Sequence, residues 1–238
     1  MKLKPILLSA VIALNTAMAA GCTDIEDTPA ETADNTELEI PEDHTSVTAN
    51  GYVIKRINGV TYVDGIIIAN KTFTLPASYD PGIRREAVDS FMEMQSAAAA
   101  DGVSLFVISG YRSYYKQKSV HSGWISIDGE EKADTYSARA GYSDHQTGYT
   151  YDLNSCDQSF AYTPAAKWLA EHCVEYGFII RYPDGKEAYT GFTYEPWHIR
   201  WIGAEKAKLI TESGLSLEEY YGIPSSYDIS ADEFFGLE

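Results

Sequence analysis

Two short stretches supply, at four spaced positions, two histidines and two carboxylates whose chemistry requires them to meet in the folded chain. Residues 143–152 read Ser-Asp-His-Gln-Thr-Gly-Tyr-Thr-Tyr-Asp, and residues 195–198 read Glu-Pro-Trp-His. Two imidazoles and one carboxylate can hold a catalytic zinc ion, leave a fourth coordination position open, and use a second carboxylate for proton transfer. A fold that builds such a site has to place these distant segments side by side.

Local signals indicate how each stretch presents its side chains. Residues 149–154 alternate as a strand does, which puts Asp152 on a strand and His145 on the turn before it. Gly148 allows the backbone to bend tightly between the two. Glu195 precedes a proline and is therefore biased to an extended conformation. This Glu-x-x-His is thus distinct from the helical His-Glu-x-x-His motif of metalloproteases.

The remaining pattern alternates strands and helices. The predicted elements are a hairpin at 52–63 with Asn58-Gly59 at its turn, an apolar run at 65–69, a helix from Asp80-Pro81 to Gly102, a strand at 103–108 central to a sheet, a helix capped by Ser113, a polar surface loop at 125–136, a strand at 149–154, a helix from 163 to Gly177, strand candidates at 178–181 and 191–194, a helix at 204–213, and a short helix behind a capping box at Ser216. In the first helix, residues 83, 87, 91, 94 and 98 recur at helical spacing and are predicted core. The mixed order predicts an α+β fold.

The first residues have the pattern of an export signal. Two lysines precede an apolar run at residues 5–20, which is too short to span a bilayer comfortably. Two cleavage patterns compete. Residues 17–19 form an A-x-A site that would release a secreted protein, whereas residues 19–22 resemble a bacterial lipobox that would leave a lipid on Cys22. We expect residues 1–22 to be a signal peptide of the lipoprotein type.

An acidic segment follows and separates this signal from the folded part. Residues 23–50 contain nine acids and no lysine or arginine, which predicts a disordered linker. The folded domain is expected at residues 51–238, with its core at about 70–203. The formal net charge of −17 argues against nucleic-acid binding. We expect an exported, extracytoplasmic monomer, either secreted or held at the membrane only through the lipid.

Two cysteines remain for the folded domain if Cys22 is lipidated. Cys156 and Cys173 would lie in an oxidising compartment, where they can form one disulfide. They can equally be two buried thiols, and the sequence leaves both alternatives open.

Three motifs carry a family resemblance. Ser-Gly-Tyr-Arg-Ser at 109–113, Ser143-x-His145-x6-Asp152 and Glu195-x-Trp197-His198 resemble the motifs of zinc D-alanyl-D-alanine carboxypeptidases of the vancomycin-resistance type. An Asn-Lys-x-x-x-Leu-Pro segment at 70–76 adds to the likeness. That family is grouped with lysostaphin-like peptidases and the hedgehog signalling domain, the LAS group. The likeness implies a small antiparallel sheet flanked by helices.

The resemblance also implies roles for individual positions. It makes His145, Asp152 and His198 the ligands of a Zn2+ ion, Glu195 the catalytic base, Arg112 the substrate-binding and transition-state arginine, and Ser143 and Gln117 substrate-contacting residues. Three positions depart from the family pattern, namely Ala140 in place of Pro, Asp144 in place of Glu, and Thr150 in place of Ala. None of the three is an implied ligand, so they bear on substrate fit more than on the metal.

Three functions compete on this basis. The leading one is a zinc D,D-carboxypeptidase that removes the terminal D-Ala from peptidoglycan stem peptides. The second is an L,D-carboxypeptidase that trims the tetrapeptide stem, since related enzymes share all three motifs. The third is a zinc-stabilised wall-binding module without turnover. Glu195 speaks against the module, because a structural zinc needs no free carboxylate.

Overall fold

The computed structural model describes residues 43–237. The predicted signal peptide, Cys22 and most of the predicted linker lie outside the described residues. Between residues 43 and 237, every helix is too short or too polar to cross a membrane.

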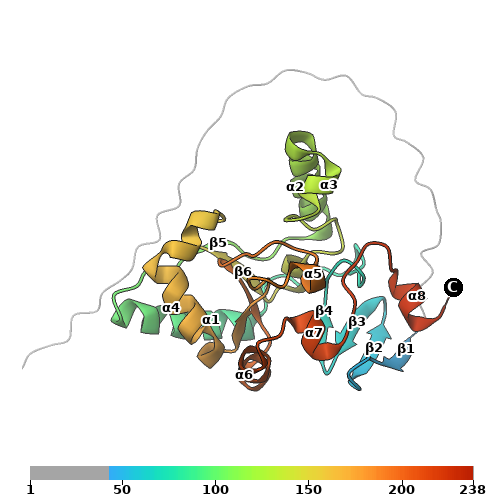
Figure 1. Ribbon diagram of the computed structural model, residues 1–238, viewed down its shortest axis with the longest axis horizontal. Helices are drawn as coiled ribbons and strands as arrows, with labels where there is room; N and C mark the ends of the chain where they lie inside the picture. The colour runs from blue at the N-terminus through green and yellow to red at the C-terminus, as the bar shows by residue number, and fades with distance from the viewer. Residues whose placement is uncertain (1–42, 238) are drawn as a thin grey trace, which may run out of the picture. The chain divides into compact units, whose positions relative to one another are not determined.

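The described strands form two antiparallel sheets of four strands each (Figure 1). The first sheet has the order β1-β2-β3-β4, with β1 at His44–Val47, β2 at Val53–Ile57, β3 at Val60–Val63 and β4 at Ile66–Ile68. The second sheet has the order β5-β6-β8-β7, with β5 at Val107–Ser109, β6 at Thr150–Leu153, β7 at Phe178–Ile180 and β8 at His198–Trp201. The α+β prediction is confirmed.

Different helices pack against the two sheets. They are α1 at Arg85–Ala100, α2 at Tyr114–Asp128, α3 at Glu130–Ala133, α4 at Pro164–His172, α5 at Glu187–Thr190, α6 at Ala204–Ser213, α7 at Leu217–Tyr221 and α8 at Ala231–Phe235. Apolar residues of α1 and α4 pack with β6 and β8 in one core, and those of α6, α7 and α8 pack with the first sheet in another. In Figure 1, α2 and α3 stand away from both sheets as an arm.

The predicted hairpin is present, and the fold starts earlier than Gly51. Asn58 and Gly59 have φ values of 50° and 76°, the left-handed conformations that an Asn-Gly turn accepts readily. β1 pairs with β2 from His44 opposite Arg56 to Val47 opposite Val53. The predicted boundary at 51 is therefore wrong, because the last residues of the acidic segment are hydrogen-bonded into the sheet.

The first long helix is shorter than its sequence pattern. It begins at Arg85, not at Asp80-Pro81, and Gly82 in a left-handed conformation separates the two. Ile83 consequently lies outside the helix and is 62% exposed, contrary to its predicted place in the core. The other four predicted core positions, at 87, 91, 94 and 98, are buried.

Three further predictions need correction. The run at 103–108 yields β5, an edge strand and not a central one, and its Phe106 and Ile108 are about half exposed. The predicted loop at 125–136 instead continues α2 and adds α3. No strand forms at 191–194, because Gly191 (φ 77°) ends α5 and the chain then turns into the site.

The second sheet positions the site residues. β6 and β8 are neighbours, and their register puts Asp152 opposite His198. On the other side of β6, Ser109 of β5 is also opposite Asp152, so the chain leaves β5 next to the same position. Two motifs distant in sequence thus meet through ordinary antiparallel pairing.

Candidate active site

Three buried side chains from different elements meet at one point. His145 lies in the 3-10 turn at Asp144–Thr147, Asp152 on β6 and His198 on β8. One nitrogen or oxygen of each lies within 4.8 Å of the others. Their exposed fractions are 1%, 3% and 4%.

His145 is oriented by a backbone carbonyl. Its Nδ1 lies 2.7 Å from the oxygen of Gly110. A carbonyl oxygen only accepts hydrogen bonds, so Nδ1 carries the hydrogen and donates it. The other nitrogen, Nε2, keeps its lone pair and faces Oδ2 of Asp152 at 3.1 Å. Burial lowers the pKa of His145, which favours the neutral imidazole that a metal requires.

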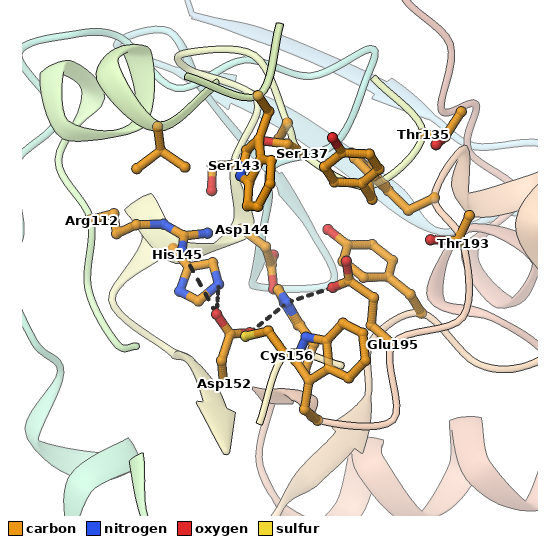
Figure 2. A pocket seen from close by; sticks show the side chains of 18 of the residues that line it. Arg112, Thr135, Ser137, Ser143, Asp144, His145, Asp152, Cys156, Thr193 and Glu195 are labelled. Atoms are coloured by element: carbon orange, nitrogen blue, oxygen red, sulfur yellow. Dashed lines mark ion pairs between the residues drawn. The ribbon is translucent and has the colours of Figure 1, made fainter. Parts of the chain in front are cut away.

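His198 presents its two nitrogens to different partners. Nδ1 lies 3.2 Å from Oδ1 of Asp152 and 3.1 Å from Oε2 of Glu195. Nε2 points the other way, and Oδ2 of Asp144 lies 3.7 Å from it. Figure 2 marks ion pairs of this group, among them the one between His145 and Asp152.

The donor set fits a metal ion. Nε2 of His145 and Oδ1 of Asp152 are buried polar atoms without a hydrogen-bond partner among the described residues, and such atoms are costly unless something binds them. Burial alone would raise the pKa of Asp152, but the hydrogen bond and charge of His198 hold it well below its usual value, so the carboxylate is ionised. Two imidazole nitrogens and one carboxylate oxygen match a zinc site with an open position.

Glu195 lies beside this donor set. Its backbone N–H donates to the carbonyl of Tyr182 at 3.0 Å, which fixes the extended turn before Pro196. Burial raises the pKa of its carboxyl group above the ordinary value for glutamate. A carboxyl group with a raised pKa near a metal site is suited to exchanging protons near neutral pH.

Arg112 approaches the group from another side (Figure 2). Its Nη1 donates to Oγ of Ser109 at 3.0 Å and lies 3.7 Å from Oδ2 of Asp152. Ser143 is buried and lines the same cavity. Gln117 does not line it; its Nε2 donates instead to the carbonyl of Ala138 at 2.6 Å. The structure thus brings all the predicted site residues together except Gln117, which contacts the cavity wall from behind.

The site opens into a cavity of about 650 Å³. Val120 and Trp124 of the arm contribute to its wall, as does Tyr136, which follows α3. The segment before β8 contributes Phe192 and Trp197. The sequence linked the polar segment 125–136, and with it Tyr136, to the site, but no sequence pattern linked Trp124 to it.

The two cysteines of the domain are free thiols. Cys173 is buried in the core, whereas Cys156 is exposed and lines the cavity. Partial burial, together with the charges of Asp152 and Glu195, raises the pKa of the Cys156 thiol to about 12. The structure therefore has no disulfide between them, and of the two buried thiols that were the other alternative only Cys173 is buried.

A layer of buried charges lies beneath the site. Asp144 is hydrogen-bonded to Arg200, and Arg181 is paired with Glu218. All four are almost fully buried. The sequence singled out Asp144 only as a departure from a motif, and nothing in the pattern of the two strands signalled that their arginines point inward.

Comparison with known proteins gives the family. The family model described as VanY, D-alanyl-D-alanine carboxypeptidase, matches residues 80–204, from the segment before α1 to the start of α6. The chain belongs to the VanY family. The resemblance seen in the three motifs is confirmed, and all the candidate site residues fall inside the matched range.

Relatives within and around the VanY family differ in specificity. The YodJ protein of Bacillus subtilis (strain 168), named as a carboxypeptidase, is 31% identical over 258 residues, which cover 90% of this chain and 94% of that protein. The solved structure of the LdcB LD-carboxypeptidase is 41% identical, with a TM-score of 0.63, and covers 77% of this chain and 98% of that chain. A VanY D,D-pentapeptidase solved in complex with Zn(II) is 34% identical, with a TM-score of 0.57, and covers 65% of this chain and 97% of that chain.

Proposed function

We propose that the protein is a zinc-dependent carboxypeptidase that releases the C-terminal D-alanine from peptidoglycan stem peptides. The observation that carries this proposal is the buried donor set of His145, Asp152 and His198 with Glu195 beside it, at the base of an open cavity. Membership of the VanY family supports the same chemistry.

His145, Asp152 and His198 would hold the zinc ion. When bound, zinc supplies a Lewis acid and lowers the pKa of a water molecule to about 7. Glu195 would take the proton of the attacking water and pass it to the departing amine, as general base and then general acid. Its raised pKa suits both steps, because the group must accept and then give up the same proton.

Arg112 and Ser143 would hold the substrate. The guanidinium of Arg112 is always charged and presents a fork of donors, which suits either the terminal carboxylate of the peptide or the oxyanion that forms during hydrolysis. Ser109 keeps that guanidinium in place. Gln117 was expected to contact substrate, and we propose that it acts indirectly, by fixing the Ala138 carbonyl in the cavity wall.

D,D specificity is the first candidate, because the family model describes D-alanyl-D-alanine carboxypeptidases. L,D specificity is the second. The LdcB structure covers more of this chain than the D,D-pentapeptidase does and is more similar in sequence. Both candidates release D-alanine and differ in the residue that precedes it.

Export of the protein follows from the proposed substrate, which lies outside the cytoplasm. We propose that residues 1–22 form a lipoprotein signal and that a lipid on Cys22 anchors an otherwise monomeric protein. Globomycin-sensitive processing and a lipid-modified N-terminal peptide in mass spectra would support the anchor, and an unmodified mature N-terminus after residue 19 would overturn it.

The deciding experiment incubates purified zinc-loaded protein separately with muropeptide pentapeptide and tetrapeptide and follows the products by mass spectrometry. Loss of one alanine from the pentapeptide alone supports D,D-carboxypeptidase action. Loss from the tetrapeptide alone supports L,D-carboxypeptidase action. If neither peptide loses alanine although zinc is bound, carboxypeptidase action on these stems is excluded.

A further inference from the structure

Asp144 is a buried carboxylate that touches the site without belonging to the donor set. It is 2% exposed, and it immediately precedes His145 in the chain. Its side chain does not face His145, however. Oδ2 lies 3.7 Å from Nε2 of His198, on the side of that ring turned away from Asp152 and Glu195.

Three other side chains hold Asp144 in this position. Thr150 donates from its hydroxyl to Oδ2 at 2.7 Å. Arg200 donates from Nη1 to Oδ1, and Nε of Arg181 lies 3.8 Å from the same oxygen. Because donors contact both oxygens, the carboxylate has little freedom to turn away from His198.

The two arginines are themselves fixed. Arg200 donates from Nη2 to the carbonyl of Ile67 at 2.8 Å and from Nε to that of Trp201 at 3.1 Å. Arg181 makes two hydrogen bonds to Glu218, at 2.9 and 2.5 Å. Two carboxylates and two guanidiniums thus balance their charges inside the protein, and Asp144 is the member of this network that reaches the site.

A neutral imidazole has one N–H and one lone pair, so fixing the hydrogen on one nitrogen assigns the lone pair to the other. Nε2 of His198 is buried and has no hydrogen-bond partner within 3.5 Å among the described residues. The separation from Asp144 is that of an ion pair, longer than a direct hydrogen bond. A carboxylate at this distance still favours the tautomer whose N–H points at it.

We propose that Asp144 is a positioning residue that keeps the hydrogen of His198 on Nε2 and so leaves the lone pair of Nδ1 for the metal. This inference rests on the proposed zinc function. The two histidines then have different orienting partners, since the Gly110 carbonyl orients His145 and the Asp144 carboxylate orients His198. Partners of this kind typically change metal affinity by about 10–100-fold when they are removed.

A purely structural role makes a different prediction. If Asp144 only neutralises the arginines, removing its charge should change zinc affinity as much as removing the charge of Glu218 does. Glu218 belongs to the same network, is equally buried, and does not contact His198. Asp144→Asn and Glu218→Gln therefore form a matched pair, since each replaces one buried carboxylate by an amide of the same shape.

The first measurement is the zinc dissociation constant of the full-length protein and both variants by chelator competition. We expect Asp144→Asn to weaken zinc binding about 10–100-fold. Glu218→Gln should change zinc affinity less than about 3-fold, because Glu218 does not contact the proposed ligands. Asp144→Glu should recover part of the lost affinity. Equal affinities for all proteins, or equal losses in the two amide variants, would overturn the proposal.

The second measurement needs no variant and reads the tautomer directly. Nitrogen-15 NMR of the histidine rings in the zinc-loaded wild-type protein should show His198 protonated at Nε2. Protonation at Nδ1 would overturn the proposal even if Asp144→Asn failed to fold. Failure of the wild-type protein to bind zinc would overturn both this inference and the proposed function. Zinc binding with the expected Asp144 effect, but without release of D-alanine, would remove the proposed function alone.

Discussion

The carboxylate of Glu195 shares Nδ1 of His198 with Asp152 and yet is outside the proposed donor set. Glu195→Gln keeps the size and one oxygen of the side chain but removes its ability to take a proton. We expect kcat for D-alanine release to fall by about 10²–10⁴, with one zinc ion per protein retained. Metal analysis and turnover of the same preparation test this.

The exposed glutamate Glu212 provides the control for that variant, because Glu212→Gln alters charge equally and lies on the surface of α6. Loss of turnover in Glu195→Gln with zinc intact also excludes the binding-module alternative. Unchanged turnover would remove Glu195 from the mechanism.

Cys156 looks accessible, but its surroundings make it a poor nucleophile. A pKa of about 12 leaves roughly one thiol in 10⁴ ionised at pH 8, against roughly one in four for an ordinary cysteine. In metal-stripped protein, alkylation of Cys156 by iodoacetamide should be at least about 10²-fold slower than that of a free thiol. Peptide mass spectrometry over time measures the rate.

Glu195→Gln should speed that alkylation, because it removes one of the negative charges that disfavour the thiolate. An alkylation rate equal to that of a free thiol would show that burial and the neighbouring carboxylates do not raise the pKa of Cys156.

The sequence indicated the candidate metal ligands and the candidate proton-transfer group. It did not indicate the buried side chains that hold them in place. The motifs pointed to His145, Asp152, His198 and Glu195, and the structure brings these four side chains together. Arg181 directly follows the short strand β7 and Arg200 lies in β8, each next to an aromatic residue, at positions where an arginine usually faces solvent. Only the tertiary fold shows that buried acids from distant segments meet them.

Among the elements, the turn from His145 to Asp152 has the tightest constraint. Gly148 has φ 81°, and a Cβ there would collide with the carbonyl oxygen of Gly82. Gly148→Ala therefore combines an unfavourable backbone conformation, about 1–2 kcal/mol, with a collision against backbone that cannot move freely. We expect lower stability and weaker zinc binding, because the turn sets where His145 lies relative to Asp152.

Gly102→Ala separates these two effects. Gly102 has a similar φ of 77°, but a Cβ there meets nothing within 4 Å. Urea unfolding should show Gly148→Ala to be the less stable by at least about 2 kcal/mol, and only Gly148→Ala should lose zinc affinity. Equal losses of stability would mean that the contact with Gly82 relaxes without cost.

Element boundaries were the weaker part of the sequence prediction, for identifiable reasons. Asp80-Pro81 is a good helix start in isolation. In the structure, however, Gly82 is left-handed, and the Arg84 N–H donates to the Gly148 carbonyl, so this segment holds the turn that carries His145. The apolar run that ends in β5 predicted a central strand. Its outer residues are exposed because the sheet ends there, which composition alone does not reveal.

At the scale of the whole molecule, an ion pair ties α7 to the second sheet. Arg181 follows β7, and Glu218 lies on α7; both side chains are no more than 1% exposed. Breaking such a buried pair leaves an uncompensated charge and costs about 3–5 kcal/mol. Glu218→Gln should lower the free energy of unfolding by about this amount, measured in urea.

The exposed ion pair of Lys208 and Glu212 on α6 serves as the control. Both side chains are about two-thirds exposed, so Glu212→Gln should cost less than about 1 kcal/mol. Similar losses in the two variants would show that the Arg181 pair does not hold α7 to the sheet.

Metal removal should affect stability more strongly as pH rises. In the metal-free protein, burial alone would lower the pKa of His198, but Asp144, Asp152 and Glu195 raise it well above 6.5. A raised folded-state pKa contributes stability that is complete below the unfolded value of about 6.5 and is lost as pH rises through the folded value. His145, whose pKa is lowered, is already neutral in both states above about pH 6.5 and does not offset this loss.

Zinc would replace that proton with a charge that does not titrate, so the loaded protein should lack this loss. The drop in Tm on adding a chelator should therefore be larger at pH 9 than at pH 7, and calorimetry at both values measures it. At 1,000 times the dissociation constant, free zinc contributes about 4 kcal/mol. His198→Gln, which removes both the ligand and the titrating group, should abolish the difference between the two pH values. If the chelator lowers Tm equally at pH 7 and 9 in the wild-type protein, protonated His198 does not stabilise the three carboxylates around it.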